Sequence, residues 1–519
     1  MKIGFLNLFP MRPHSEYMAY LSSRLGEDHE VNILSCFNDF SSCHYKLWND
    51  HHGISTCIKC KAGSLSLNQN SKNVTKINSL KLESYNECEK PKHSMVINSI
   101  ANIKRIEKSE QLDSLTGSVE YDKLTASKEK MSKVTRAWVT KENFDVVLIF
   151  NGRMDLMDSA LREIKAMKVP FYTLESSNTN VGIRIQEGVS CVNHDNFEEN
   201  LLKFINYPLT KHQTTVAYSF YYNRLKNLNN YEWRHFEQNK NYNLDVSLLG
   251  KYILVLPSSM YEFHGLLDGK CEWNNPLEGF DLIVKKFRNN GYNIVFRFHP
   301  NWAKKVGKYS SNAQEDYLNY CKSNNFIYYD SSSKVPTREL IKSSSLVLVN
   351  GGSSAIEACL MLKQVINIYP AKFNVAGFLD LFTENGNIPK VVGNEMLNIR
   401  RRYCLRYLYF NMRMYPSLQK FIKPISSLDY KYNYLDKLDI TDILNPLNLS
   451  FEDYEGGSEI KEDIIINMFD NKKNDELDEM YVNLSLSENE IYDSFHSMKT
   501  NNKFIKIINK IRQILPKGD

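Results

Sequence analysis

The stretch SLVLVNGGSSAIEACLMLKQVINIYP, residues 345–370, decides the fold. It predicts a strand, a Gly-Gly-Ser-Ser turn, a helix and a second strand. Earlier in the chain, IVFRFHPNW (residues 294–302) predicts another strand, which ends on Arg297, His299 and Pro300. The carboxyl ends of parallel strands share one edge of an open α/β sheet, and ligands bind at that edge. We therefore expect the histidine and the serine turn to reach the same crevice.

Strands and helices alternate on both sides of these two stretches, at the spacing of a parallel sheet with right-handed crossovers. The predicted strands of the first half are 2–8, 30–36, 144–150 and 169–174, and those of the second half are 252–256, 292–298, 326–329, 346–349 and 364–368. The sequence therefore predicts an α/β protein with two Rossmann-like domains that face each other across a cleft.

A chain of 519 residues is too long for one hydrophobic core, so more than one domain is expected. We predict an N-terminal acceptor domain over 1–245, with an insertion at about 38–140 that is partly loop and partly a polar helical segment. A C-terminal nucleotide-binding domain is predicted over 246–395. Residues 396–519 are predicted to form an extension that is helical, acidic and amphipathic.

The Gly-Gly-Ser-Ser turn has the composition of a phosphate site. Gly352 allows a ligand to approach the backbone, while Ser353 and Ser354 offer hydroxyl and N–H donors at the start of a helix. Glu357, three residues after Ser354, either completes a capping box or holds a ribose hydroxyl. At the other strand end, His299 would donate to a phosphate or ribose with help from Arg297. The alternative is a simple strand terminus, because proline ends a ladder of hydrogen bonds.

Together, Arg-x-His-Pro and the segment around Gly-Gly-Ser-Ser resemble the C-terminal half of bacterial capsule and surface-polysaccharide glycosyltransferases of the GT-B fold. The resemblance is greatest to those that use CMP-activated acidic sugars such as Kdo or sialic acid. It implies that His299-Pro300 and Ser353-Ser354 hold the donor nucleotide and its phosphate. Residues 150–175, FNGRMDLMDSALREIKAMKVPFYTLE, also resemble capsule-biosynthesis proteins. In all, the resemblance covers roughly residues 140–380, and its motifs also occur in polyol-phosphate transferases and sugar-nucleotide epimerases.

This resemblance implies an enzyme that transfers a sugar from a nucleotide-sugar donor to a growing surface polysaccharide or a lipid-linked glycan. Two alternatives remain. One is a CDP-alcohol polyol-phosphate transferase or sugar-nucleotide epimerase of the same fold, and the other is a non-catalytic scaffold for glycan assembly.

Candidate catalytic residues follow two strands of the first half. Asn151 and Arg153 come directly after strand 144–150, where Arg153 would clamp a carboxylate of the acceptor or donor. The alternative is a glycine-containing turn with a solvated arginine. Glu175 ends the next strand, where it would act as a general base or in a retaining mechanism. A salt-bridged or helix-capping acid is its alternative role.

The cysteine pattern allows a metal site but does not favour one. Cys57-x-x-Cys60 is a proper pair of zinc ligands, but no second pair follows at zinc-finger spacing, so reduced thiols are the favoured interpretation. No Asp-x-Asp motif ends a predicted strand. We therefore expect metal-independent transfer with no cofactor, in which helix dipoles and basic side chains stabilise the leaving group.

Charge is distributed unevenly along the chain. The net charge is +5, yet residues 451–490 hold thirteen acids and three lysines, a local charge of −10. The basic remainder suits anionic nucleotides, glycans or a membrane surface, and no nucleic-acid-reading module is visible. The basic segment 399–422 and the terminal stretch 503–515 either lie on a membrane or pack on the domains. With no signal peptide or spanning segment, the expected location is the cytoplasm, with peripheral attachment to the inner face of the membrane as an option.

Overall fold

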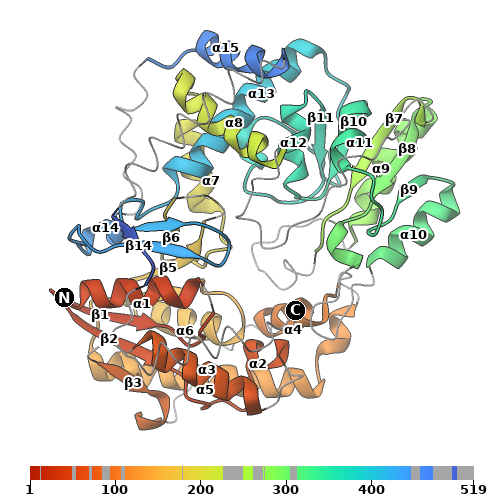
Figure 1. The fold of residues 1–519 in the computed structure, drawn as a ribbon. Helices are drawn as coiled ribbons and strands as arrows, with labels where there is room; N and C mark the ends of the chain where they lie inside the picture. The colour runs from red at the N-terminus through yellow and green to blue at the C-terminus, as the bar shows by residue number, and fades with distance from the viewer. Residues whose placement is uncertain are drawn as a thin grey trace.

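The computed structural model of the chain contains two large α/β units (Figure 1). The residues that the structure describes are 1–11, 13–49, 54–68, 73–83, 94–106, 111–177, 179, 181–225, 249–260, 273, 275–303, 313–445, 456–471 and 494–498.

The N-terminal sheet has six strands in the order β3-β2-β1-β4-β5-β6. These are β1 (Lys2–Leu6), β2 (Glu30–Ser35), β3 (Val74–Lys76), β4 (Val146–Phe150), β5 (Phe171–Ser176) and β6 (Ile183–Glu187). All neighbours are parallel except β5 and β6, which pair antiparallel. The central strand β4 reads VVLIF, an apolar run suited to a strand covered by helices on both faces.

The C-terminal sheet also has six strands, in the order β12-β11-β10-β7-β8-β9, all parallel. They are β7 (Tyr252–Leu256), β8 (Asn293–Arg297), β9 (Ile327–Tyr329), β10 (Leu346–Val349), β11 (Gln364–Asn367) and β12 (Asp380–Leu381). The connecting helices are α9 (Pro276–Asn289), α10 (Ala313–Asn324), α11 (Thr337–Ser343) and α12 (Ser354–Leu360). Counted along the chain, both sheets share one order, third-second-first-fourth-fifth-sixth, which is the Rossmann order.

The predicted fold class, α/β with two Rossmann-like domains, is confirmed by these sheets. In the Rossmann order the first strand lies between the second and the fourth, so the strand order reverses there. A crevice opens at this point, at the carboxyl ends of the first and fourth strands. These are β1 and β4 in one sheet and β7 and β10 in the other. The predicted cleft between the two domains stays a prediction.

The region predicted as an insertion adds more regular structure than expected. Within its described residues it contributes β3 to the N-terminal sheet and the helices α2 (His44–Trp48), α3 (Ile54–Leu67), α4 (Ser94–Lys104) and α5 (Val119–Glu142). Helix α5 packs on α6 (Asp155–Ala166) and buries Met131, Val134 and Trp138 against the sheet. The expected helical segment is confirmed, although its polar composition hides this apolar stripe.

Two segments pack on the domain that lies farther from them along the chain. Helices α7 (Asp195–Phe204) and α8 (Lys211–Leu225) share a hydrophobic cluster with the C-terminal sheet, and Figure 1 shows α8 beside α13 (Asn394–Tyr409). Conversely, a small antiparallel sheet of β13 (Ile422–Pro424), β14 (Tyr430–Asn433) and β15 (Phe495–His496) shares a cluster with α1 (His14–Leu25) and β1, as does α14 (Thr441–Leu444). The two domains are therefore joined by crossing segments, and the predicted boundaries at 245 and 395 stay predictions.

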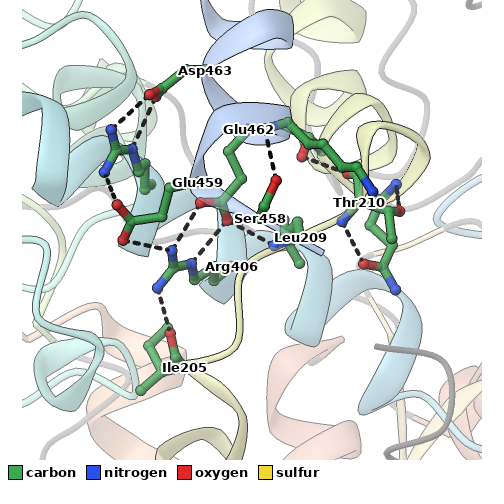
Figure 2. Close-up of polar contacts among 12 residues, drawn as sticks. Ile205, Leu209, Thr210, Arg406, Ser458, Glu459, Glu462 and Asp463 are labelled. Carbon is green, nitrogen blue, oxygen red and sulfur yellow. Dashed lines mark hydrogen bonds and ion pairs between the residues drawn. The ribbon is translucent and has the colours of Figure 1, made fainter. Parts of the chain in front are cut away.

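The basic segment after residue 399 pairs with acids of the same chain. Arg400 binds Asp380, while Arg401, Arg402 and Arg406 bind carboxylates of α15 (Glu459–Asp470). Figure 2 shows how Arg406 and Glu462 meet between α13 and α15. The guanidinium groups of Arg401, Arg402 and Arg406 therefore hold the acidic helix α15 on the protein. Attachment of the basic segment to a membrane stays a prediction. The stretch 503–515 lies outside the described residues. In the part of the chain that is described, no helix is both long and apolar enough to cross a bilayer.

Candidate functional site

The ends of β7 and β10 are locked together by one asparagine. The Asn350 side chain accepts a hydrogen bond from the Ser258 backbone N–H at 2.6 Å and donates to the Ser258 carbonyl at 3.1 Å. Asn350 directly follows β10, and Ser258 lies two residues after β7. This pairing joins the two strand ends at the switch point of the C-terminal sheet and holds the serine turn against the loop after β7.

The next residue connects the same loop to the histidine turn. The Trp302 indole N–H donates to the Ser259 hydroxyl at 2.9 Å, and Trp302 belongs to the short 3-10 helix Pro300–Ala303 that follows His299. Ser258 and Ser259 thus join the two motifs that the sequence singled out. Both serines and Asn350 were absent from the predicted site. The pattern Pro-Ser-Ser directly after a buried strand, at the same sheet edge as His299, is the signal that points to them.

The tautomer of His299 follows from its neighbour. The Asn301 backbone N–H donates to His299 Nδ1 at 3.2 Å, so Nδ1 must carry a lone pair. The neutral imidazole therefore bears its proton on Nε2 and can donate only from that atom. His299 is partly exposed at the carboxyl edge of the sheet. This is the protonation state that hydrogen bonding to a phosphate oxygen requires.

The glycines of the serine turn are required by its geometry. Gly351 has a φ of +86°, and its N–H donates to the Asn367 side chain at 2.8 Å. A Cβ atom on Gly352 would lie 2.3 Å from the Ser258 hydroxyl, so a larger residue would have to displace that hydroxyl. Ser353 is exposed and Ser354 partly exposed at the start of α12. The Ser353 side chain makes no capping hydrogen bond at the start of α12.

Two residues predicted to bind the donor have protein partners. The buried Arg297 guanidinium donates to the carbonyls of Phe298, Asp330 and Ser333, which fixes the loop after β9. Glu357 forms an ion pair with Arg224 of α8. These contacts favour a structural role for both residues, and their part in donor binding stays a prediction. Short-range patterns could not show it, because all but one of these partners lie more than thirty residues away.

At the switch point of the N-terminal sheet, the turn after β4 is held in an unusual conformation. Asn151, Gly152 and Met154 all have positive φ, at 63°, 68° and 69°. A Cβ atom on Gly152 would lie 2.5 Å from a methyl carbon of Leu161, so glycine is required. The Asn151 side chain accepts from the Arg153 backbone N–H at 2.7 Å. Strain of this kind persists where a side chain must be held in one position.

The strained turn after β4 positions the Asn151 side chain, which faces Glu175. Asn151 Nδ2 donates to Glu175 Oε2 at 2.8 Å, and the Ser176 backbone N–H donates to Oε1 at 2.8 Å. His14 Nδ1 lies 3.4 Å from Oε1, and the Cys191 thiol donates to Oε2 at 3.6 Å. The structure therefore brings two of the three predicted catalytic residues together and adds His14, from the start of α1. Three donors converge on a carboxylate that is 14% exposed.

The charge state of this pair follows from its surroundings. Burial alone would raise the pKa of Glu175, but His14, Arg184 and the bonds from Ser176 and Asn151 outweigh burial and hold the pKa below its ordinary value. Burial lowers the pKa of His14, against the opposite pull of Glu175. Near neutral pH, Glu175 is therefore ionised and His14 is neutral. An ionised carboxylate with a fixed orientation can accept a proton from a substrate hydroxyl.

The Arg153 backbone N–H donates to Asn151, and the charge of its side chain acts on two sides. It lowers the pKa of His44 of the insertion, which burial and Arg153 bring to about 3, and it acts on Cys191, whose thiol donates to Glu175. The role of Arg153 as a substrate clamp stays a prediction.

The predicted zinc ligands lie on α3. Cys57 and Cys60 are free thiols, and the Cys60 thiol donates to the Leu8 carbonyl at 3.8 Å. Among the described residues, no three His, Cys, Asp or Glu side chains are grouped so that they could hold a metal ion.

Arg105 of the insertion reaches the histidine turn of the other domain. Its guanidinium donates to the Asn301 carbonyl at 2.8 Å, and the residue is buried, with a φ of +55°, directly after α4. We expect Arg105→Ala to speed amide hydrogen exchange at residues 299–303 about tenfold, because a charge-assisted bond to a partly buried carbonyl is lost. Lys104→Ala, which removes a surface pair with Glu120, is the matched control. Equal exchange in Arg105→Ala and the wild type would refute the contact.

No family model and no curated protein matches the sequence. Among solved structures, a β-Kdo 2,4-transferase from Thermosulfurimonas dismutans is 14% identical, with a TM-score of 0.35. The match covers 59% of this chain and 87% of the transferase chain. A UDP-GlcNAc 2-epimerase from Methanocaldococcus jannaschii is 16% identical, with a TM-score of 0.26. The match covers 78% of this chain and 93% of the epimerase chain. These neighbours include two of the three kinds of enzyme that the sequence resemblance named, a glycosyltransferase and a sugar-nucleotide epimerase. Similarities of this size assign no activity or substrate to the chain.

Proposed function

We propose that this chain is a glycosyltransferase that moves a sugar from a nucleotide-sugar donor to a surface polysaccharide or lipid-linked glycan. One observation supports the proposal: the carboxyl edges of the two Rossmann-like sheets carry different chemical groups. The N-terminal sheet presents Glu175, an oriented and ionised carboxylate. The C-terminal sheet presents an imidazole with its proton on Nε2 and a glycine-serine turn, which the loop after β7 joins through Ser258 and Ser259.

The proposed reaction divides between these two edges. Glu175 takes the proton of the acceptor hydroxyl as that oxygen attacks the sugar, and Asn151 and Ser176 keep the carboxylate aimed. His299 Nε2–H, with the hydroxyl and N–H donors of Ser353 and Ser354, stabilises the charge that develops on the leaving phosphate. In this proposal the transfer needs no metal ion. A lipid-linked acceptor would bring the protein to a membrane surface.

Histidine variants test the donor half of the proposal. Gln places an amide N–H near the position of Nε2, whereas Asn places one near Nδ1, so only Gln retains the proposed donor. We expect one nucleotide among CMP, CDP, UDP and GDP to raise the melting temperature of the wild type. His299→Gln should keep part of this shift, and His299→Asn and His299→Ala should lose it.

The reaction itself needs a separate measurement. Once one nucleotide is found to bind, the protein is incubated with a sugar linked to that nucleotide, with and without a glycan acceptor. The products are then separated by mass. Transfer that requires the acceptor supports the proposal. Conversion of the donor to an isomer without any acceptor would overturn the proposal in favour of an epimerase. The donor site would be refuted if His299→Ala bound the four nucleotides as well as the wild type does.

A further inference from the structure

Helix α4 of the insertion is packed firmly on the N-terminal domain. It lies against α5 and α6 and also contacts α2. One face of the helix belongs to a hydrophobic cluster made of Val96, Ile100, Leu115, Tyr121 and Leu124. The burial of this face fixes α4 against the domain, so a contact made at one end of the helix is held in place by the whole of it.

A second anchor ties α4 to the turn that positions Asn151. The hydroxyl oxygen of the buried Ser99 accepts a hydrogen bond from the Asp155 backbone N–H at 3.0 Å. Asp155 is the first residue of α6 and directly follows Met154, which ends the strained turn after β4. The same turn holds the Asn151 side chain against Glu175. Helix α4 is therefore connected to the edge that carries the proposed catalytic carboxylate.

The C-terminal end of α4 reaches the other domain. Arg105 directly follows the helix, is 2% exposed, and donates to the Asn301 carbonyl at 2.8 Å. Figure 1 shows α4 on the side of the N-terminal unit that is nearest to the C-terminal unit. Ser99 and Arg105 are only about two turns of helix apart, a rise of about 9 Å. One short, packed element thus makes contact with both edges of the proposed active site.

The residue that Arg105 binds is also the one that fixes the donor histidine. The Asn301 backbone N–H donates to His299 Nδ1 at 3.2 Å, which leaves the ring proton on Nε2. The adjoining Trp302 is held from the C-terminal domain itself, by the Ser259 hydroxyl at 2.9 Å. The carbonyl and the N–H of Asn301 belong to one residue, so a bond that fixes the carbonyl also restrains the N–H that sets the tautomer.

We propose that Arg105 is a positioning residue for His299, and that α4 sets the spacing between the two edges of the proposed active site. Arg105 acts through Asn301: it keeps the Asn301 N–H on Nδ1, so the proton of the imidazole stays on Nε2 for the donor phosphate. Nucleotide binding and the Arg105–Asn301 bond then favour each other, because coupling between two sites is reciprocal. The inference rests on the proposed function for the role of His299, whereas the tautomer does not depend on it.

The tautomer of His299 tests the positioning without any substrate. The full chain is labelled with ¹⁵N in its histidine rings, and the His299 signals are identified by NMR through their absence from His299→Asn. In the wild type we expect one tautomer, with the proton on Nε2. Arg105→Met keeps the length of the side chain but has no donor, so both tautomers should appear. Arg105→Lys can still donate to a carbonyl and should restore the wild-type tautomer.

Nucleotide affinity tests the consequence for the donor site. The nucleotide that binds among CMP, CDP, UDP and GDP is titrated into the full chain by calorimetry. Arg105→Met should weaken its binding about fivefold or more, the low end of the usual coupling between two sites. Lys104→Met is the matched control, because Lys104 precedes Arg105 and pairs with Glu120 at 3.6 Å within the N-terminal domain. This variant should keep the affinity and the His299 tautomer of the wild type.

The wild-type protein provides a measurement that needs no variant. If the coupling is reciprocal, the bound nucleotide should slow amide hydrogen exchange in residues 94–104 by up to about the same fivefold factor, although these residues belong to the other domain. Arg105→Met should show no such slowing, and Lys104→Met should show it in full. The melting temperature of each variant shows whether it folds, and the wild-type exchange together with Arg105→Lys decides the question if Arg105→Met does not.

Each result supports or overturns the inference. A single tautomer with the proton on Nε2 in a folded Arg105→Met would overturn the positioning role, as would wild-type affinity for the nucleotide in that variant. Exchange in residues 94–104 that is the same with and without bound nucleotide would overturn the coupling. If the wild type binds none of the four nucleotides, the proposed function fails at the donor site, and the tautomer measurement still decides the role of Arg105.

Discussion

Arg406→Met is expected to lower the free energy of unfolding by about 3–5 kcal/mol, because it leaves a buried carboxylate without its cation. Arg406 donates to both oxygens of Glu462, at 2.9 and 2.8 Å, and the two side chains are 3% and 0% exposed. Glu462 also accepts from the Leu209 N–H at 2.9 Å, and Arg406 donates to the Ile205 carbonyl (Figure 2). The pair thus anchors α15 to α13 and to the chain between α7 and α8.

Two further variants separate the pair from its surroundings. Arg402→Met removes an arginine of the same helix whose partners Glu459 and Asp463 are largely solvated, and it should cost less than about 1 kcal/mol. The double variant Arg406→Met/Glu462→Met should recover much of the loss, because no unpaired charge remains. Urea unfolding followed by circular dichroism measures all three. A loss under 1 kcal/mol in Arg406→Met, or a double variant no more stable than the single one, would contradict the argument.

Glu175→Gln is expected to reduce kcat about 10²- to 10⁴-fold, the usual contribution of a general base. Gln keeps the size of the side chain but cannot accept the proton. The depressed pKa of Glu175 means that the wild-type carboxylate is already ionised at neutral pH. The wild-type rate should therefore hold from pH 7 down to the acid range and fall only as the pH drops through the lowered carboxyl pKa.

The neighbouring Glu187→Gln variant is the control for this change. Glu187 lies on β6, is exposed, and carries the same charge, so its loss should leave kcat unchanged. Nucleotide-induced thermal shifts should be equal in both variants, because the donor half of the site is untouched. A kcat for Glu175→Gln within a few-fold of the wild type would remove this residue from the catalytic role and leave it a positioning acid for His14.

Much of the C-terminal sheet could be predicted from sequence because its signals are local. The apolar run Tyr252–Leu256 and the Gly-Gly-Ser-Ser turn determine strand and turn through neighbouring residues. Parallel topology then places the strand ends at one edge, so His299 and Ser353 were expected there before any contact was known. The same reasoning placed Asn151 and Glu175 at the ends of two strands of the other sheet, and the structure shows that they bond to each other.

Two of the residues predicted to bind the donor have partners that the sequence did not indicate. The Arg297 guanidinium donates to the main-chain carbonyls of Asp330 and Ser333, and Glu357 forms an ion pair with Arg224. For the arginines after residue 399 the sequence left open a membrane surface or packing on the domains, and three of them pair with carboxylates of α15. A charge pattern in sequence shows that a partner is needed and does not show which one.

The amino-acid sequence by itself determined the alternation of strands and helices, the order of chemistry along the chain and the two edges where that chemistry lies, because backbone preference and apolar periodicity act over a few residues. Tertiary structure alone decided which charges remain available to a substrate. Ion pairs and hydrogen bonds between α8 and α12, between α13 and α15, and from Arg105 to Asn301 join residues far apart in the chain. Their formation depends on the packing of whole domains, which no short stretch of sequence encodes.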